Sequence, residues 1–203
     1  MNISRQNVTR GYGLLEKFLA KKRIKMANSL IPASYRKGRL LDIGCGSYPL
    51  FLLNVEFSEK YGLDKIGGKQ RDALQSQNIF FLEYDIEHKD NLPYEDNNFD
   101  VVTILAVFEH IEPKKIPNIL CEIYRILKPK GICILTTPAA RAVLPLKIMA
   151  KMQLVSSTEL AEHKYAYKPL EIAAIFEKTP FGKENLQCGY FEFNMNIWMT
   201  AKK

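Results

Sequence analysis

The sequence predicts an α/β protein with a doubly wound, seven-stranded, mostly parallel sheet that ends in an antiparallel hairpin. Two observations favour this fold. Short apolar runs alternate with helix-like stretches along most of the chain, which is typical of a parallel sheet covered by helices. Later in the chain, residues 186–193 and 196–202 are strand-like and are separated only by a tight turn around Asn194, so they should pair antiparallel. A length of 203 residues suits a single domain.

Five more strands are expected before this hairpin, each a short run rich in apolar or β-branched residues. Between them, helical spacing of apolar residues predicts helices over 13–30, 49–54 and 114–127, and a further helix begins near Pro169. The five predicted strands cover residues 39–43, 60–64, 79–85, 99–105 and 132–137.

Charge is divided unevenly along the chain. The formal net charge of +7 would suggest an anionic partner. Residues 1–40, however, contain ten Lys or Arg and one acidic residue, a net charge of +9, so the remaining 163 residues carry −2. The basic residues belong to an N-terminal segment, and half of them lie in the predicted helix over 13–30. They form either a solvated face or a surface for an anionic ligand, a membrane surface or RNA.

The cysteines and the apolar runs bear on the cellular compartment of the protein. Cys45, Cys121, Cys133 and Cys188 have no C-x-x-C spacing, so they predict neither a metal site nor a disulfide framework. The first 30 residues are polar and basic, without the apolar core of a secretory signal. No uninterrupted apolar stretch approaches the ~18 residues that a membrane span requires. We therefore expect a cytoplasmic protein, with peripheral membrane contact left open.

A glycine loop follows the first predicted strand. The run 40–46 reads Leu-Leu-Asp-Ile-Gly-Cys-Gly and precedes a predicted helix. Such a loop lets a ligand approach the backbone at the carboxyl end of the strand, where open α/β sheets bind ligands. A dinucleotide fingerprint needs a small residue at position 49, which is Pro49, and no phosphate-binding Gly-Lys-Ser/Thr follows. The loop therefore favours a nucleoside ligand without phosphates.

Carboxylates end the next two strands. Asp64 lies 20 residues beyond Gly44, where it could accept hydrogen bonds from a ribose diol. Asp85 is followed by Ile86, a polar and then an apolar residue, which suits one edge and one face of a purine. These positions indicate that the nucleoside lies along the carboxyl edge of the sheet.

Six motifs follow one another over about residues 39–137. They are the run 40–46, Tyr-Gly-Leu-Asp at 61–64, Asp-Ile at 85–86, Leu-Pro-Tyr at 92–94 before Phe-Asp-Val-Val at 99–102, Phe-Glu-His at 108–110, and Ile-Leu-Lys-Pro-Lys-Gly at 126–131. In this order they resemble the class I S-adenosylmethionine-dependent methyltransferases, most closely the small-molecule type 11 branch. The resemblance implies a Rossmann-like fold, S-adenosyl-L-methionine as cofactor and methyl transfer as activity.

The resemblance also implies roles for individual residues. Asp64 would hold the ribose with Lys65 beside it, Asp85 would meet the adenine amino group, and Ile86 would cover the adenine ring. In place of the family's common third glycine, this chain has Tyr48, a ring that could narrow the pocket or stack on the ligand. The residues expected around the methionine part of the cofactor are Asp42, Gly44, Cys45 and Gly46, with Leu105 and Ala106 at its end.

Three candidates for catalysis follow from position. Glu109 and His110 come after the fourth predicted strand, at the mouth of the expected site, and a neutral imidazole suits a general base near pH 7. His163 lies in a segment that faces the acceptor in similar proteins. Each residue could instead be structural, with its side chain holding the loop through backbone hydrogen bonds. We predict no metal at the site.

We expect one domain over residues 1–203. It comprises a basic helical segment (1–38), a cofactor-binding core (39–137), an acceptor cover (138–168), and a helix with the terminal hairpin (169–203). The apolar run 139–155 either covers an apolar or amphipathic acceptor or packs as a helix on the sheet.

The predicted function is methyl transfer to a small-molecule, lipid or sugar-containing acceptor, which could be anionic or amphipathic. A nucleic-acid methyltransferase is the first alternative. The run Leu-Ala-Val-Phe at 105–108 lacks both the Asn/Asp-Pro-Pro-Tyr/Phe and the Pro-Cys motifs of such enzymes. A non-catalytic protein that binds S-adenosylmethionine is the second alternative, and it rests on Tyr48.

Overall fold

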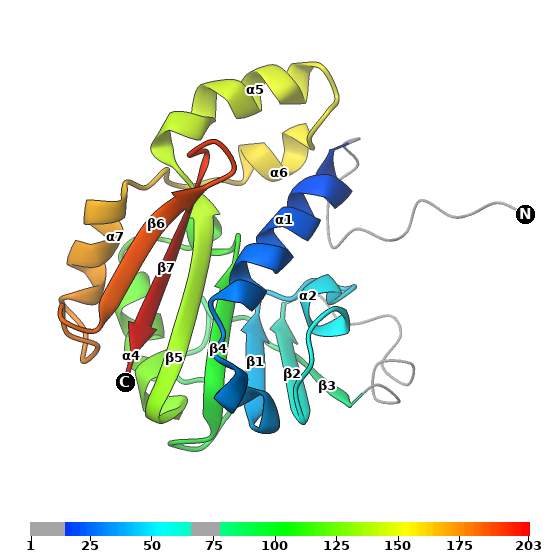
Figure 1. Ribbon diagram of the computed structural model, residues 1–203. Coiled ribbons are helices and arrows are strands. Elements are labelled where there is room, and N and C mark those ends of the chain that lie inside the picture. The colour runs from blue at the N-terminus through cyan, green and yellow to red at the C-terminus, as the bar shows by residue number, and fades with distance from the viewer. Residues whose placement is uncertain (1–14, 66–77) are drawn as a thin grey trace, which may run out of the picture.

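The computed structural model describes residues 15–65 and 78–203, apart from the side chain of Glu159, and it confirms the predicted α/β fold (Figure 1). Residues 13 and 14 of the predicted N-terminal helix lie outside the described residues. In the described part of the chain, seven strands form one sheet in the order β3-β2-β1-β4-β5-β7-β6. The strands are β1 (Arg39–Ile43), β2 (Glu59–Asp64), β3 (Ile79–Glu83), β4 (Phe99–Leu105), β5 (Leu127–Pro138), β6 (Leu186–Phe191) and β7 (Asn196–Lys202).

The strand directions match the prediction. β1 pairs in parallel with β2 and β4, and β2–β3 and β4–β5 are parallel as well. β7 is antiparallel to both β5 and β6, and it lies between them. The parallel strands therefore end along one edge, and the hairpin extends the sheet beyond β5.

Helices cover both faces of the sheet, because successive side chains of a buried strand point to opposite sides. In β1, Leu41 enters one core cluster and Leu40 the other. α4 and α7 cover the first face, and α1 and α2 the second (Figure 1). No helix in the described ranges has the length and apolar character needed to span a bilayer. The helix bounds are α1 (Glu16–Ser29), α2 (Leu50–Leu53), α4 (Ile116–Ile126), α5 (Val143–Lys151), α6 (Ser157–Ala161) and α7 (Pro169–Phe176).

The fifth strand begins earlier than its sequence indicates. The turn residues at 129–131 lie inside β5 as an irregularity, where Lys130 adopts a left-handed φ of 68°. Across this point the register with β4 shifts: Phe99 pairs with Leu127, and Val101 pairs with Ile132. The third strand, in contrast, is shorter than predicted, because it ends at residue 83 rather than 85.

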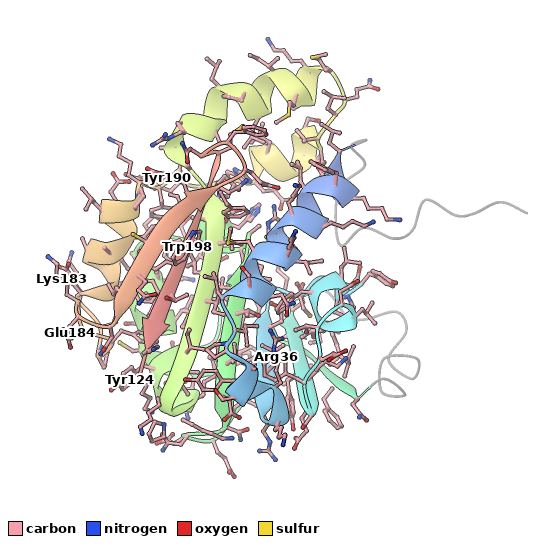
Figure 2. The ribbon with its side chains drawn as sticks, viewed as in Figure 1. Arg36, Tyr124, Lys183, Glu184, Tyr190 and Trp198 are labelled. Carbon is pink, nitrogen blue, oxygen red and sulfur yellow. The ribbon has the colours of Figure 1, made fainter. Side chains whose placement is uncertain are left out.

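The terminal hairpin turns through three consecutive left-handed residues, Glu192, Phe193 and Asn194. Figure 2 shows Tyr190 and Trp198 on its two strands. The guanidinium of Arg141 lies 4.3 Å from the centroid of the Tyr190 ring, a cation–π contact. Arg141 belongs to the short helix η3 (Ala140–Ala142), so the hairpin is joined to the segment that follows β5.

The apolar run 139–155 does not pack as a helix on the sheet, so that alternative is wrong. Its helix α5 lies beyond the carboxyl ends of the parallel strands (Figure 1). None of the α5 side chains is fully buried, and Leu144 is 68% exposed. The helix therefore lies above the edge where the sequence predicts the ligand.

Candidate active site

A cavity of about 550 Å³ opens at the carboxyl ends of the parallel strands. This volume falls in the range of small-molecule sites. Its floor consists of the ends of β1, β2 and β4 and the chain that continues from β3. Its roof comes from α1, from the segment running from η3 through α6, and from the turn of the terminal hairpin.

The glycine loop forms the centre of the floor. Gly44 and Gly46 both line the cavity with left-handed φ angles of 74° and 75°. A Cβ atom at position 44 would lie 2.2 Å from Cγ2 of Val107, so only glycine fits there without displacement. The backbone N–H of Gly46 donates to Oδ2 of Asp64 at 2.8 Å, which ties the loop to the end of β2. Loop and carboxylate thus hold one another in place.

Two of the residues expected near the methionine part of the cofactor lie behind the loop. Neither Asp42 nor Cys45 is among the described residues that line the cavity, and Tyr48 is also absent from them. Asp42 is 3% exposed and accepts a hydrogen bond from Oγ1 of Thr103 at 2.6 Å. Burial raises the pKa of Asp42 to about 7, against the opposing effect of the Thr103 hydrogen bond. Cys45 packs in the core, where burial raises the pKa of its thiol well above the usual value.

The carboxylates predicted at the strand ends both line the cavity. Asp64 is 3% exposed, and Lys65 follows it in the same wall. Asp85 and Ile86, which follow the neighbouring strand β3, also line the cavity. Burial alone would raise the pKa of Asp85, but hydrogen bonds from the backbone of Glu87 and from His88, both at 2.9 Å, lower it. Asp85 is therefore ionised at neutral pH.

The chain leaves β4 through a strained turn. Leu105 and Ala106 line the cavity as predicted, and Ala106 has a left-handed φ of 54°. The backbone N–H of Ala106 donates to the carbonyl of Thr136 on β5 at 2.8 Å. A non-glycine residue in this conformation needs such support. The turn directs the following residues, among them Glu109 and His110, toward the cavity.

The three candidate catalytic residues lie together between floor and roof. One ligand-type atom each of Glu109, His110 and His163 falls within 4.8 Å of the others. The two imidazole rings meet edge to face, with centroids 4.9 Å apart. Glu109 is 2% exposed and accepts a hydrogen bond from Oγ1 of Thr137 at 3.0 Å. We call these three residues the Glu-His-His cluster.

Backbone contacts bring His163 to this place. The N–H of Lys164 donates to the carbonyl of Glu109 at 2.8 Å, and its ammonium lies 3.0 Å from Glu87. The carbonyl of Glu162 lies 3.3 Å from Nδ1 of His110. Burial lowers the pKa of His163, outweighing the nearby Glu109, so its imidazole is neutral at pH 7.

The roof contributes residues that the sequence analysis did not assign to the site. Most roof side chains are apolar, whereas Arg23 brings one of the basic groups of α1 to the cavity. Helical spacing alone could not identify these positions, because the same pattern also describes a buried core. From α1 they include Glu16, Leu19 and Arg23, from α5 and α6 Leu146, Met149, Leu160 and Ala161, and from the hairpin Glu192, Met195 and Asn196.

Fold and site together define a class of protein. A parallel sheet extended by an antiparallel hairpin, with a glycine loop and carboxylates facing a cavity, is the arrangement of the class I methyltransferases. In agreement, residues 41–135 match the family model described as "Methyltransferase domain". These residues, just under half of the chain, therefore form a methyltransferase domain of that family.

Three known proteins illustrate the similarity. A ubiquinone biosynthesis O-methyltransferase of Rickettsia bellii (strain OSU 85-389) is 27% identical over 174 residues, which are 80% of this chain and 69% of that protein. The tRNA N(3)-methylcytidine methyltransferase Mettl2 of Drosophila melanogaster is 27% identical over 105 residues, 46% of this chain and 32% of that protein.

The third is a solved structure. The 1,6-didemethyltoxoflavin-N1-methyltransferase of Burkholderia thailandensis, with bound 1,6-didemethyltoxoflavin and S-adenosylhomocysteine, has a TM-score of 0.64 at 15% identity. The match covers 93% of this chain and 81% of that one. At this identity the likeness shows the fold.

Proposed function

We propose that the protein transfers the methyl group of S-adenosyl-L-methionine to a small molecule with an apolar body, which binds beneath α5 and α6. The observation that carries this proposal is the contrast between the two sides of one cavity. The floor presents the carboxyl groups of Asp64 and Asp85 and a glycine loop, whereas the roof is mainly apolar. Relatives named for ubiquinone and demethylmenaquinone chemistry also favour a small-molecule acceptor.

The floor suits a cationic nucleoside. Asp64 would accept hydrogen bonds from the ribose while it holds Gly46, and Asp85 with Ile86 would contact the adenine. Carboxylates at this wall also favour the positive charge of the sulfonium over the neutral product. Leu105 and Ala106 would then lie near the methyl group.

The roof suits the acceptor. Methyl transfer is an in-line displacement, so the protein mainly has to place the acceptor behind the methyl group and exclude water. Leu146 and Met149 would hold the apolar body, while the Glu-His-His cluster would face the reacting atom. A general-base role for His110 stays a prediction.

Cofactor binding is tested by calorimetry with S-adenosylmethionine. We expect Asp64→Asn to weaken binding at least about tenfold, because it removes a charged acceptor of hydrogen bonds. The matched control is Asp90→Asn, an exposed aspartate that does not line the cavity, and its affinity should equal that of the wild type. No binding by the wild type, or normal binding by Asp64→Asn, would contradict the assignment.

The acceptor is tested by incubating the protein with labelled methyl donor and a cell extract. The label should enter low-mass compounds that partition into an apolar phase. Label found in RNA instead would refute the proposed acceptor class while leaving the enzyme class intact.

A further inference from the structure

We propose that Glu109, His110 and His163 form a binding site for a divalent transition-metal ion of the zinc type, which holds a hydroxyl group of the acceptor. The role of the ion rests on the proposed function, whereas the metal site itself does not. The cluster lies in the wall of the cavity, between the floor and the roof, and each of its members reaches the cavity.

The donor set matches this kind of ion. Two imidazoles and one carboxylate are ligands typical of catalytic zinc sites, which leave a further position open. Ligand atoms at about 2.1 Å from one ion lie roughly 3–4 Å from one another. The three atoms here lie within 4.8 Å of one another, which is close to that spacing.

The surroundings of two ligands have the form expected around a metal. Metal-bound histidines usually donate their second ring N–H to a carbonyl or carboxylate, and metal-bound carboxylates are themselves hydrogen-bonded. The carbonyl of Glu162 lies 3.3 Å from Nδ1 of His110, which leaves Nε2 for the ion. Thr137 donates to Oε2 of Glu109 at 3.0 Å. Both partners orient the ligands without occupying all of their donor atoms.

Charge balance indicates what the open position takes. Histidine binds a metal as the neutral imidazole and glutamate as the carboxylate, so these three ligands would leave a net charge of +1 on a divalent centre. An oxyanion neutralises that charge, and a bound ion lowers the pKa of a hydroxyl that coordinates it. The hydroxyl proton would pass to water, and the oxygen would form its bond to the methyl carbon. The electrons of the breaking carbon–sulfur bond would go to sulfur, releasing neutral S-adenosylhomocysteine. In this arrangement His110 is a ligand rather than a general base.

The metal site is tested on tag-free, full-length protein that has been treated with a chelator and dialysed. Calorimetry with Zn²⁺ should show one strong site, and Co²⁺ should give the visible absorption bands of a coordinated ion. His163→Ala should weaken binding at least about tenfold. Thr137→Val, which keeps the side-chain shape but removes the hydrogen bond to Glu109, should weaken it by about tenfold as well.

His88→Ala is the matched control, because His88 is the one histidine of the chain that does not belong to the cluster. Its metal affinity should be unchanged. Circular dichroism and S-adenosylmethionine affinity show whether His163→Ala remains folded. If His163→Ala does not fold, the metal affinity of Thr137→Val and the Co²⁺ spectrum of the wild type test the metal site instead.

Failure of this inference is distinguishable from failure of the proposed function. Absence of a one-to-one site for Zn²⁺ and Co²⁺, or binding that His163→Ala leaves intact, overturns the metal site. Methyl transfer that survives chelation, with the metal site present, overturns the role of the ion. In both cases retained S-adenosylmethionine binding leaves the proposed function standing.

Discussion

The floor and the roof of the cavity are built by different means. The floor consists of strand ends and loops held by the sheet, with Gly44, Asp64 and Asp85 positioned by backbone geometry. The roof combines α1 with residues beyond 138, so its parts are far apart in sequence. The contrast suggests that the cofactor is fixed by a rigid frame, whereas the choice of acceptor is left to helices that can vary without disturbing the sheet.

The largest effect on the floor is expected from Gly44→Ala. The new Cβ would lie 2.2 Å from Val107 in a left-handed backbone, so the loop must move. We expect S-adenosylmethionine affinity to fall by about 100-fold and stability by about 1–3 kcal/mol. Calorimetry and thermal unfolding measure the two effects.

Gly182→Ala is the matched control. Gly182 also has a left-handed φ of 68°, but its Cβ would meet the carboxylate of the flexible Glu184, far from α5 (Figure 2). It should lose some stability and keep its cofactor affinity. Equal losses of affinity in both variants would mean that the loop geometry at Gly44 is unimportant.

A smaller effect is expected from a charge in the roof. Leu146→Arg places a cation against the apolar body of the acceptor, so the KM for the acceptor should rise by about tenfold. The affinity for S-adenosylmethionine should not change. Ile148→Arg is the control on the same helix, because Ile148 is 52% exposed and does not line the cavity. A weakened cofactor affinity in Leu146→Arg alone would show that floor and roof are not separate.

A separate effect, on stability and not on ligand binding, concerns the buried carboxyl beneath the floor. Asp42 keeps its proton up to about pH 7 in the folded protein, whereas the unfolded chain loses it near pH 4. The folded state binds more protons in this window, so this group makes the free energy of unfolding fall as pH rises from about 4 to 7.

Asp42→Asn should remove that contribution, which amounts to about 1.4 kcal/mol per pH unit at most. Denaturant unfolding of the ligand-free protein at pH 5 and pH 7 measures the change. Asp90→Asn, at an exposed position, should retain the wild-type pH dependence. An unchanged slope in Asp42→Asn would show that Asp42 is ionised throughout.

The sequence predicted the floor better than the roof for physical reasons. Strand ends follow from local patterns, so Asp64, Asp85 and Gly46 were placed correctly at the cavity, and the hairpin followed from the short turn between two strand-like runs. The side chains of Asp42 and Cys45 were expected at the cofactor, but neither lines the cavity. Asp42, within β1, accepts a hydrogen bond from Thr103 on β4, and Cys45, in the loop, packs in the core.

The roof depends on contacts that no local pattern encodes. His163 lies against His110 because contacts between distant segments, such as the backbone hydrogen bond from Lys164 to Glu109, bring the two together. The apolar spacing of α5 favoured a helix on the sheet at least as much as a cover, and only the fold distinguishes the two. The Glu-His-His cluster was therefore visible in the sequence as separate candidates but not as a group.

Hydrogen bonds between the described residues join α1 to the segment that follows α5. The N–H of Leu15, directly before α1, donates to the carbonyl of Leu154, and Glu16 accepts from the N–H of Ser156, 140 residues away. Hydrogen bonds of this kind contribute about 1 kcal/mol each, much less than the seven-stranded sheet with its two core clusters. As the temperature rises, α1 should therefore separate from the segment around Ser156, and so open the cavity, before the sheet unfolds. A ligand that contacts both sides would then act as a cross-link, and occupied protein should resist proteolysis near residue 155 at temperatures where empty protein is cut.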